Sequence, residues 1–158
     1  MSTDLAKARK LLDTGSHTGV LCRGDEIVAW DSRGLRELVK LLKSGKEFTG
    51  FSAADKVVGK AAALLYRAVG IDQLYAQLAS DAGVATLSAA NIPVQVGSQV
   101  ANILNRDRDG LCPMELATAD TDDPLEALAR IENFLASLPT RAQPSPPDAR
   151  QPNNSIPS

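Results

Sequence analysis

The segment of this chain with the most chemical potential runs from Asn105 to Glu115 and reads NRDRDGLCPME. It combines alternating charges, a turn glycine and a thiol, and it is too polar to form a core. Cys112 stands directly before Pro113, where the pattern predicts a helix start. Its sulfur would then lie beside unpaired backbone N–H groups, where the helix dipole favours a thiolate. Cys112 is therefore a candidate catalytic nucleophile, with Glu115 or Asp107 as the proton carrier.

Two other interpretations of Cys112 remain open. The thiol is either packed under the loop at the helix cap or serves as a redox sensor, because a buried free cysteine is the commonest state of this residue. A nucleophilic cysteine usually has an adjacent base, and His17 is the chain's single histidine. The second cysteine, Cys22, alternates into an expected strand and is expected to be a core residue.

The same loop partly resembles a calcium site. Residues 105–110 have the spacing Asn-x-Asp-x-Asp-Gly, in which alternating oxygens turn inward and glycine makes the bend. The second half does not follow, since position twelve is Leu116, Glu115 comes one residue early and Pro113 interrupts the loop. We therefore expect no metal here.

A second candidate cluster opens the broad apolar pattern of Ala53–Val69, which predicts a largely buried central helix. Lys56 and Lys60 are four residues apart and would share one face, with Gly59 between them. Two ammonium groups beside a bare backbone suit an anionic ligand, although solvated surface lysines are the ordinary alternative. A glycine inside a helix costs about 1 kcal/mol, which favours tight packing or ligand approach at Gly59.

Asp55 has two interpretations at the start of that helix. Ser52 and Asp55 fit a capping box, in which each side chain bonds the backbone N–H at the other end of the turn. Alternatively, Asp55 is a functional carboxylate at the mouth of a pocket, and it is then a candidate catalytic residue.

The remaining pattern predicts the elements that must position these residues. Apolar spacing and turn residues predict an opening helix, a hairpin and a second helix, then alternating strands and helices. Such alternation is typical of a mainly parallel sheet flanked by helices. The expected ranges are a helix at 4–13, strands at 18–22 and 27–30, a helix at 35–45, a strand at 73–79, a helix at 81–90, a strand at 92–96, a short helix or strand at 100–104 and a helix from Asp123-Pro124 to about 138.

Composition limits the function classes. The net charge of −2 supplies no overall positive field, so we expect no nucleic acid partner. No apolar run reaches the roughly 20 residues that span a bilayer, and two cysteines are too few for a disulfide scaffold, so we expect a reduced cytoplasmic protein without a membrane segment. Six of the nine prolines follow residue 138. The chain is therefore expected to be one domain at 1–138 with a disordered proline-rich tail at 139–158.

Two stretches carry a family resemblance. Residues 54–65, ADKVVGKAAALL, and the segments Asn105–Asp107 and Gly110–Glu115 resemble the DUF1893 family, bacterial proteins of unknown function. The resemblance covers roughly residues 5–138. It implies a cytidine-deaminase-like fold, a three-layer α/β/α sandwich with a mixed central sheet.

The chain departs from the zinc deaminases of that fold. Those enzymes need a His or Cys two residues before a catalytic Glu on one helix and a Pro-Cys-x-x-Cys pair at the next helix start. Here the corresponding starts read Ala53-Ala54-Asp55 and Ser80-Asp81-Ala82-Gly83, and His17 precedes the first strand. We expect neither zinc deaminase chemistry nor a cofactor.

Together these patterns predict a metal-free domain that binds a small anionic ligand such as a nucleotide or a phosphorylated metabolite. An enzyme that uses Cys112 and a scaffold whose tail recruits protein partners are the alternatives, and the sequence does not indicate an oligomeric state. The expected ligand-binding residues are Lys56, Gly59, Lys60, Asn105, Arg106 and Asp107.

Overall fold

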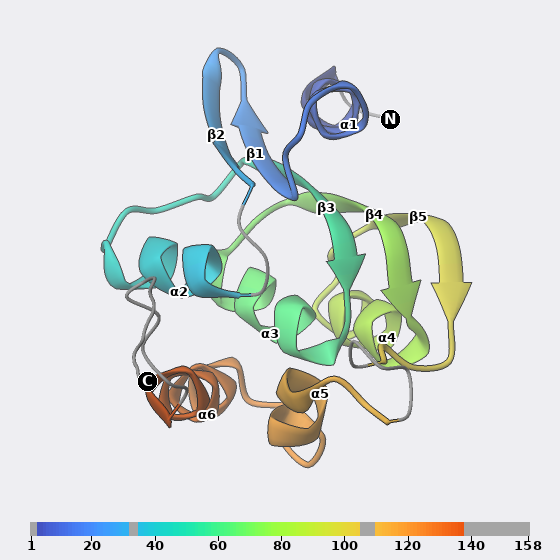
Figure 1. Ribbon diagram of the computed structural model, residues 1–158. Helices are drawn as coiled ribbons and strands as arrows, with labels where there is room; N and C mark the ends of the chain where they lie inside the picture. The colour runs from blue at the N-terminus through green and yellow to red at the C-terminus, as the bar shows by residue number, and fades with distance from the viewer. Residues whose placement is uncertain (1–2, 32–34, 105–109, 138–158) are drawn as a thin grey trace, which may run out of the picture.

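The structure is a computed structural model, and it describes residues 3–31, 35–104 and 110–137. Helices and strands alternate along most of the chain (Figure 1). The elements are α1 (Thr3–Thr14), β1 (Gly19–Arg23), β2 (Glu26–Trp30), α2 (Arg36–Lys43), β3 (Ser52–Val58), α3 (Lys60–Val69), β4 (Gln73–Ser80), α4 (Asp81–Ala89), β5 (Val94–Val100), α5 (Pro113–Thr118) and α6 (Pro124–Ser137).

The five strands form one mixed sheet in the order β2-β1-β3-β4-β5. The hairpin strand β1 pairs antiparallel with both β2 and β3. From β3 onward the sheet is parallel, because α3 and α4 each carry the chain back to the starting edge. The expected combination of a hairpin with alternating strands and helices is therefore confirmed as a mixed, open α/β sheet.

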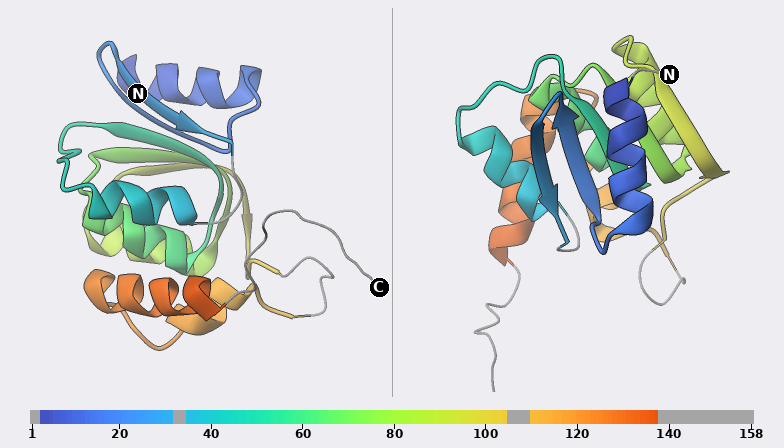
Figure 2. Two further views of the ribbon diagram at one scale, coloured as in Figure 1. Left: turned by 60° about the vertical axis from the view of Figure 1, so that its left-hand side comes forward. Right: turned by 90° about the horizontal axis from the view of Figure 1, so that it is seen from above.

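Helices cover both faces of this sheet. The α1 helix packs on one face, where Leu5, Ala8 and Leu12 meet Val20 and Ala54. The main core lies on the other face beneath α2, α3 and α4, and α5 and α6 pack outside α3 as a further layer (Figure 2). None of the helices described here is long and apolar enough to cross a membrane.

The prediction of one helix from Ala53 to Val69 is wrong in its first half. Residues 52–58 form β3, the middle strand of the sheet, and α3 begins only at Lys60. Ala53, Ala54 and Val58 are fully buried, because both faces of a central strand are covered. A strand buried on both faces lacks the apolar and polar alternation that separates a strand from a helix in sequence.

The other element predictions are confirmed with small shifts. The strand expected at 92–96 begins at Val94 and continues to Val100. The segment expected as a short helix or strand at 100–104 instead contributes the end of β5 and an isolated bridge between Leu104 and Leu111. The tail expected to be disordered, 139–158, lies outside the described residues.

Candidate functional site

The start of α3 is closed by a side chain from a distant segment. The carboxylate of Glu115, in α5, accepts hydrogen bonds from the backbone N–H groups of Lys60 at 2.8 Å and Ala61 at 3.0 Å. Gly59 is the N-cap residue and has no side chain to make these bonds. The positive end of the α3 dipole therefore holds an anion, and that anion belongs to the chain itself.

Gly59 makes this contact possible because it has no side chain. A Cβ atom there would lie 2.4 Å from Oε1 of Glu115, closer than real Cβ contacts come. Its φ of −98° is open to any residue, so close approach rather than backbone freedom explains the glycine. Of the two reasons expected for Gly59, tight packing is the one that this contact supplies.

Lys60 also serves contacts within the protein. Its ammonium group donates to the carbonyl of Ala119 at 3.0 Å and lies 3.1 Å from a carboxylate oxygen of Asp122. The side chain is only 15% exposed. Lys60 thus ties the start of α3 to the segment between α5 and α6.

Lys56 lies apart from this arrangement. It belongs to β3, and its backbone N–H donates to the carbonyl of Thr18 at 3.1 Å. Lys56 and Lys60 therefore do not share a helical face, and the paired-lysine geometry predicted from their spacing is wrong. The misplaced helix start explains the error.

Asp55 is also a strand residue, so the predicted capping box with Ser52 is wrong. Its Oδ2 accepts a 2.6 Å hydrogen bond from the hydroxyl of Tyr66, and its Oδ1 accepts from the Val57 N–H at 3.1 Å. Burial raises the pKa of the Asp55 carboxyl to about 7, and the bond from Tyr66 opposes that shift. The pKa of Tyr66 is raised as well, by burial and then by the Asp55 charge. A carboxyl that titrates near neutrality can exchange a proton, but its one side-chain partner among the described residues is the fully buried Tyr66.

The remaining predicted ligand residues, Asn105, Arg106 and Asp107, lie outside the described residues, as does Asp109 of the calcium-like spacing. Glu115, which is described, contacts the second candidate cluster at Lys60. In the part of the chain that the structure describes, no group of three or more His, Cys, Asp or Glu side chains could hold a metal ion.

Cys112 precedes the first residue of α5, where the sequence predicted a helix start. Its carbonyl accepts from the N–H groups of Glu115 and Leu116, and its thiol is partly exposed. Glu115, the proposed proton carrier, has both carboxylate oxygens bonded to the start of α3. Cys22 is buried as expected, and burial raises the pKa of its thiol.

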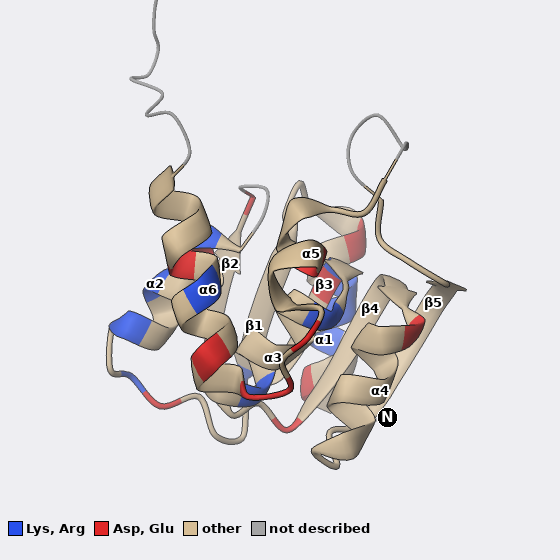
Figure 3. Ribbon diagram, turned by 90° about the horizontal axis from the view of Figure 1, so that it is seen from below, with Lys and Arg blue, Asp and Glu red and all other residues tan. Residues whose placement is uncertain are grey.

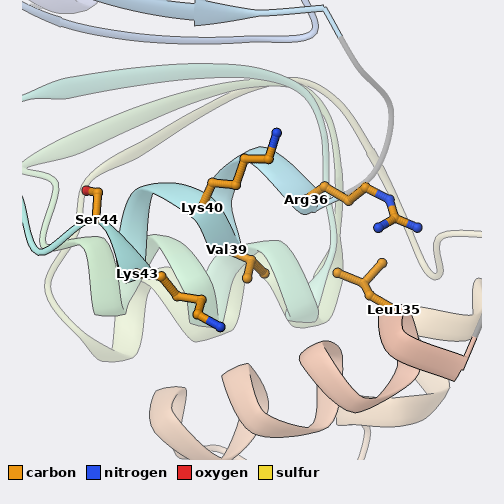
Figure 4. A pocket seen from close by; sticks show the side chains of 6 residues that line it. All are labelled: Arg36, Val39, Lys40, Lys43, Ser44 and Leu135. Carbon is orange, nitrogen blue, oxygen red and sulfur yellow. The ribbon is translucent and has the colours of Figure 1, made fainter.

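Sequence reasoning did not single out a groove between α2 and α6. This open cavity of about 470 Å³ is lined by Arg36, Val39, Lys40, Lys43, Ser44 and Leu135. Arg36 and Leu135 lie at one end and Lys43 at the other, with Val39 between them, while the Lys40 head points away from α6 (Figure 4). The groove thus combines an apolar floor with positive ends.

The basic side chains of this groove have few acidic partners. Lys43 forms a 2.7 Å ion pair with Glu132 of α6, and Lys40 lies 3.5 Å from Glu37. Figure 3 shows basic residues on α2 and both acidic and basic residues on the neighbouring α6. Arg36 has no ion pair or hydrogen bond to a side chain within residues 3–31, 35–104 and 110–137. The groove therefore has three cations, of which Lys40 and Lys43 lie beside carboxylates, while Arg36 has no such partner within the described residues.

Comparison with known proteins places this chain. Residues 7–135 match the family described as TM1506, domain of unknown function (DUF1893). The chain belongs to the DUF1893 family. The family resemblance predicted from residues 54–65 and 105–115 is thus confirmed.

A solved structure supports the fold of this DUF1893 domain. It is similar to the crystal structure of a DUF1893 family protein (TM1506) from Thermotoga maritima, with a TM-score of 0.78 and 23% sequence identity over 85% of this chain and 92% of that one. A search of curated proteins found no match. The comparisons therefore establish family and fold, and no activity.

Of the two sites in this DUF1893 domain, the groove carried a sequence signal and the start of α3 did not. Arg36, Lys40 and Lys43 recur at i, i+4 and i+7, which places basic residues on one side of α2. The contact of Glu115 with α3 had no local signal, because 55 residues separate Glu115 from Lys60. Only the placement of α5 against α3 brings them together.

Proposed function

We propose that this DUF1893 domain binds a small anionic molecule, a nucleotide or a phosphorylated metabolite, in the groove between α2 and α6. The observation that carries the proposal is the Arg36 guanidinium at the end of an open cavity, where no described side chain pairs with it. Guanidinium groups bind phosphate through two parallel hydrogen bonds.

The electrostatics of α2 favour an anion at the same end. Arg36 is the first residue of the helix, and the N-cap residue Leu35 makes no side-chain hydrogen bond to the first turn. The positive end of the α2 dipole adds to the charge of Arg36. Glu37 reduces this field, but it lies beside Lys40.

The floor of the groove suits the less polar part of such a ligand. Val39 lies between Arg36 and Lys43, whose Cα atoms are about 10 Å apart on a regular helix, and Leu135 lies at the Arg36 end (Figure 4). Ligand pockets usually measure about 300–1,000 Å³ and combine apolar walls with a few polar anchors. A nucleotide can place its phosphate at Arg36 and its base over Val39 and Leu135.

The start of α3, where the sequence predicted the ligand, is the competing binding site. There, an anion must displace Glu115 from the N–H groups of Lys60 and Ala61, and an attached carboxylate competes at a high effective concentration. Asn105, Arg106 and Asp107 would contribute from the adjoining loop. The α2–α6 groove requires no such displacement, and we therefore place the ligand there.

Thermal shift with nucleotides and inorganic phosphate tests the proposal. A ligand at 100 times its Kd stabilises the fold by about 2.7 kcal/mol, which is several degrees in Tm for a domain of this size. Arg36→Gln should abolish the shift, whereas Lys10→Gln, which removes an exposed charge on α1, should retain it. A shift that survives Arg36→Gln but increases in Glu115→Ala would move the ligand to the start of α3.

We also infer that the fold is a cytidine-deaminase-like one without a zinc centre. The support is the order of helix, hairpin, helix and alternating strands and helices, together with the absence of Cys and His at the start of α3 and α4. Binding without catalysis then fits better than an enzyme based on Cys112, because Glu115 is committed to α3.

A further inference from the structure

The outer edge of β5 is open. β5 pairs with β4 on one side, and no described element pairs with its other side (Figure 1). The N–H of Leu74 donates to the carbonyl of Pro93, and Leu74 is in register with Val94. In a parallel ladder this register turns the backbone groups of Val94, Val96, Ser98 and Val100 away from β4. These four residues thus present backbone donors and acceptors that no strand in the described part of the chain pairs with.

Nothing in β5 protects this edge. Natural edge strands usually carry charges, proline or a bulge that prevents pairing. At the opposite edge of the sheet, β2 starts with Glu26, which lies 2.8 Å from Arg23 and 3.6 Å from Lys46. β5 reads VQVGSQV, without a charge or a proline.

The sequence of β5 is nearly the same in both directions. If two copies pair antiparallel about a two-fold axis at Gly97, Val94 lies opposite Val100, Gln95 opposite Gln99 and Val96 opposite Ser98. All outward backbone groups then face outward groups of the other copy and can form about eight hydrogen bonds. Pairing about this two-fold axis makes the interface isologous, so that each chain contributes the same patch.

The burial of the β5 side chains also favours a second copy of β5 at this edge. Val94 and Val96 pack against the main core but remain only half-buried at the rim of the sheet. A neighbouring copy of β5 would place a valine opposite the exposed part of Val94 and extend the apolar face. Gln95 and Gln99 add no charge that would oppose this pairing.

We propose that the protein forms a two-fold dimer through antiparallel pairing of β5 with β5 of a second copy, giving one continuous ten-stranded sheet. The dimer is a separate property from ligand binding and does not depend on it. The ligand groove lies between α2 and α6, which pack with α3 rather than β5.

Light scattering of the full chain across a concentration series tests the dimer. The expected mass is twice the monomer mass of 16.7 kDa. Ser98→Pro removes an outward N–H without touching the bonds to β4, so it should raise the dimer dissociation constant at least tenfold. Ser98→Thr keeps the N–H and should leave the constant unchanged. A monomer at every concentration, or a dimer indifferent to Ser98→Pro, would overturn the proposal.

Cross-linking tests the register even if Ser98→Pro does not fold. Chains with Gln95→Cys and chains with Gln99→Cys, both in a Cys112→Ser background, are oxidised alone and mixed. The proposed register places these two positions opposite one another as a non-hydrogen-bonded pair, whose Cα separation of about 4.5 Å suits a disulfide. A disulfide dimer should form mainly in the mixture, and equal yields in all three samples would overturn the register.

Discussion

The carboxylate of Glu115 lies 2.8 Å from the backbone nitrogen of Lys60, where it occupies the start of α3. The two residues come from the two segments on which the family resemblance depends. An acid and a helix N-terminus thus join these segments without any ligand. This contact gives Glu115 a defined structural role, and the following changes test it.

Replacing Glu115 should destabilise the fold. Glu115→Ala removes two charge-assisted hydrogen bonds and the cap of α3, so the free energy of unfolding should fall by about 1–3 kcal/mol. Glu115→Gln keeps the shape and should cost less. Glu47→Gln, at an exposed position, serves as the control and should change little. Urea unfolding measures all three, and an unchanged midpoint in Glu115→Ala would contradict the role.

Gly59→Ala should destabilise through the same contact. The added Cβ would meet the Glu115 carboxylate, which must then leave the helix start. Because Glu115→Ala removes the obstacle, the double variant should be more stable than the sum of the two single effects, by about 0.5–3 kcal/mol. A double-mutant cycle in urea gives this coupling energy, and strict additivity would refute direct contact.

Asp55 should make stability depend on pH. In the folded protein the pKa of this carboxyl is about 7, whereas in the unfolded chain it is near 3.8. Between these values the folded state binds the extra proton, so the free energy of unfolding should fall as the pH rises through this range. Above the folded pKa this contribution no longer changes.

The slope from this one proton is at most about 1.4 kcal/mol per pH unit. Asp55→Asn keeps a group that can accept from Tyr66 but cannot titrate, so it should remove this component. Urea unfolding from about pH 4 to pH 8 measures the effect in both proteins. Parallel pH profiles for the two would contradict a raised pKa at Asp55.

The two cysteines should differ in reactivity. Cys22 is buried and its thiol pKa is raised by burial, so alkylation there requires opening of the fold. Cys112 is partly exposed and should react first. Mass spectrometry after timed alkylation distinguishes them. Labelling of Cys112 much faster than that of a free thiol would revive the enzyme alternative, whereas ordinary kinetics fit a cysteine at a helix cap.

Local sequence signals were sufficient for most of the fold. The hairpin, α4 and the Asp123-Pro124 start of α6 follow from turn chemistry and caps that act over a few residues. The prediction was wrong for β3 because the alanines and Val58 of this strand are buried on both faces. That burial depends on the rest of the sheet. The same error affects the predicted site, because the pattern places Asp55, Lys56 and Lys60 on one helix.

The contacts of the site were less predictable than its elements. The partners of Glu115 and Asp55 lie 55 and 11 residues away, and no periodic pattern encodes such pairs. The α2–α6 groove exists because Leu135 of α6 lies close to α2, and this depends on the tertiary packing of the two helices. In contrast, the basic residues Arg36, Lys40 and Lys43 on one side of α2, and the lack of charge in β5, can be predicted from the sequence once these elements are known.

The most direct test of ligand binding in the groove is an NMR titration of the full chain with a nucleotide, following the backbone amide signals. The largest changes in chemical shift should fall on α2 around Arg36 and Val39 and on the last turn of α6 near Leu135, and Arg36→Gln should abolish them. Changes confined to Lys60, Ala61 and Glu115, with α2 unaffected, would contradict binding in the groove.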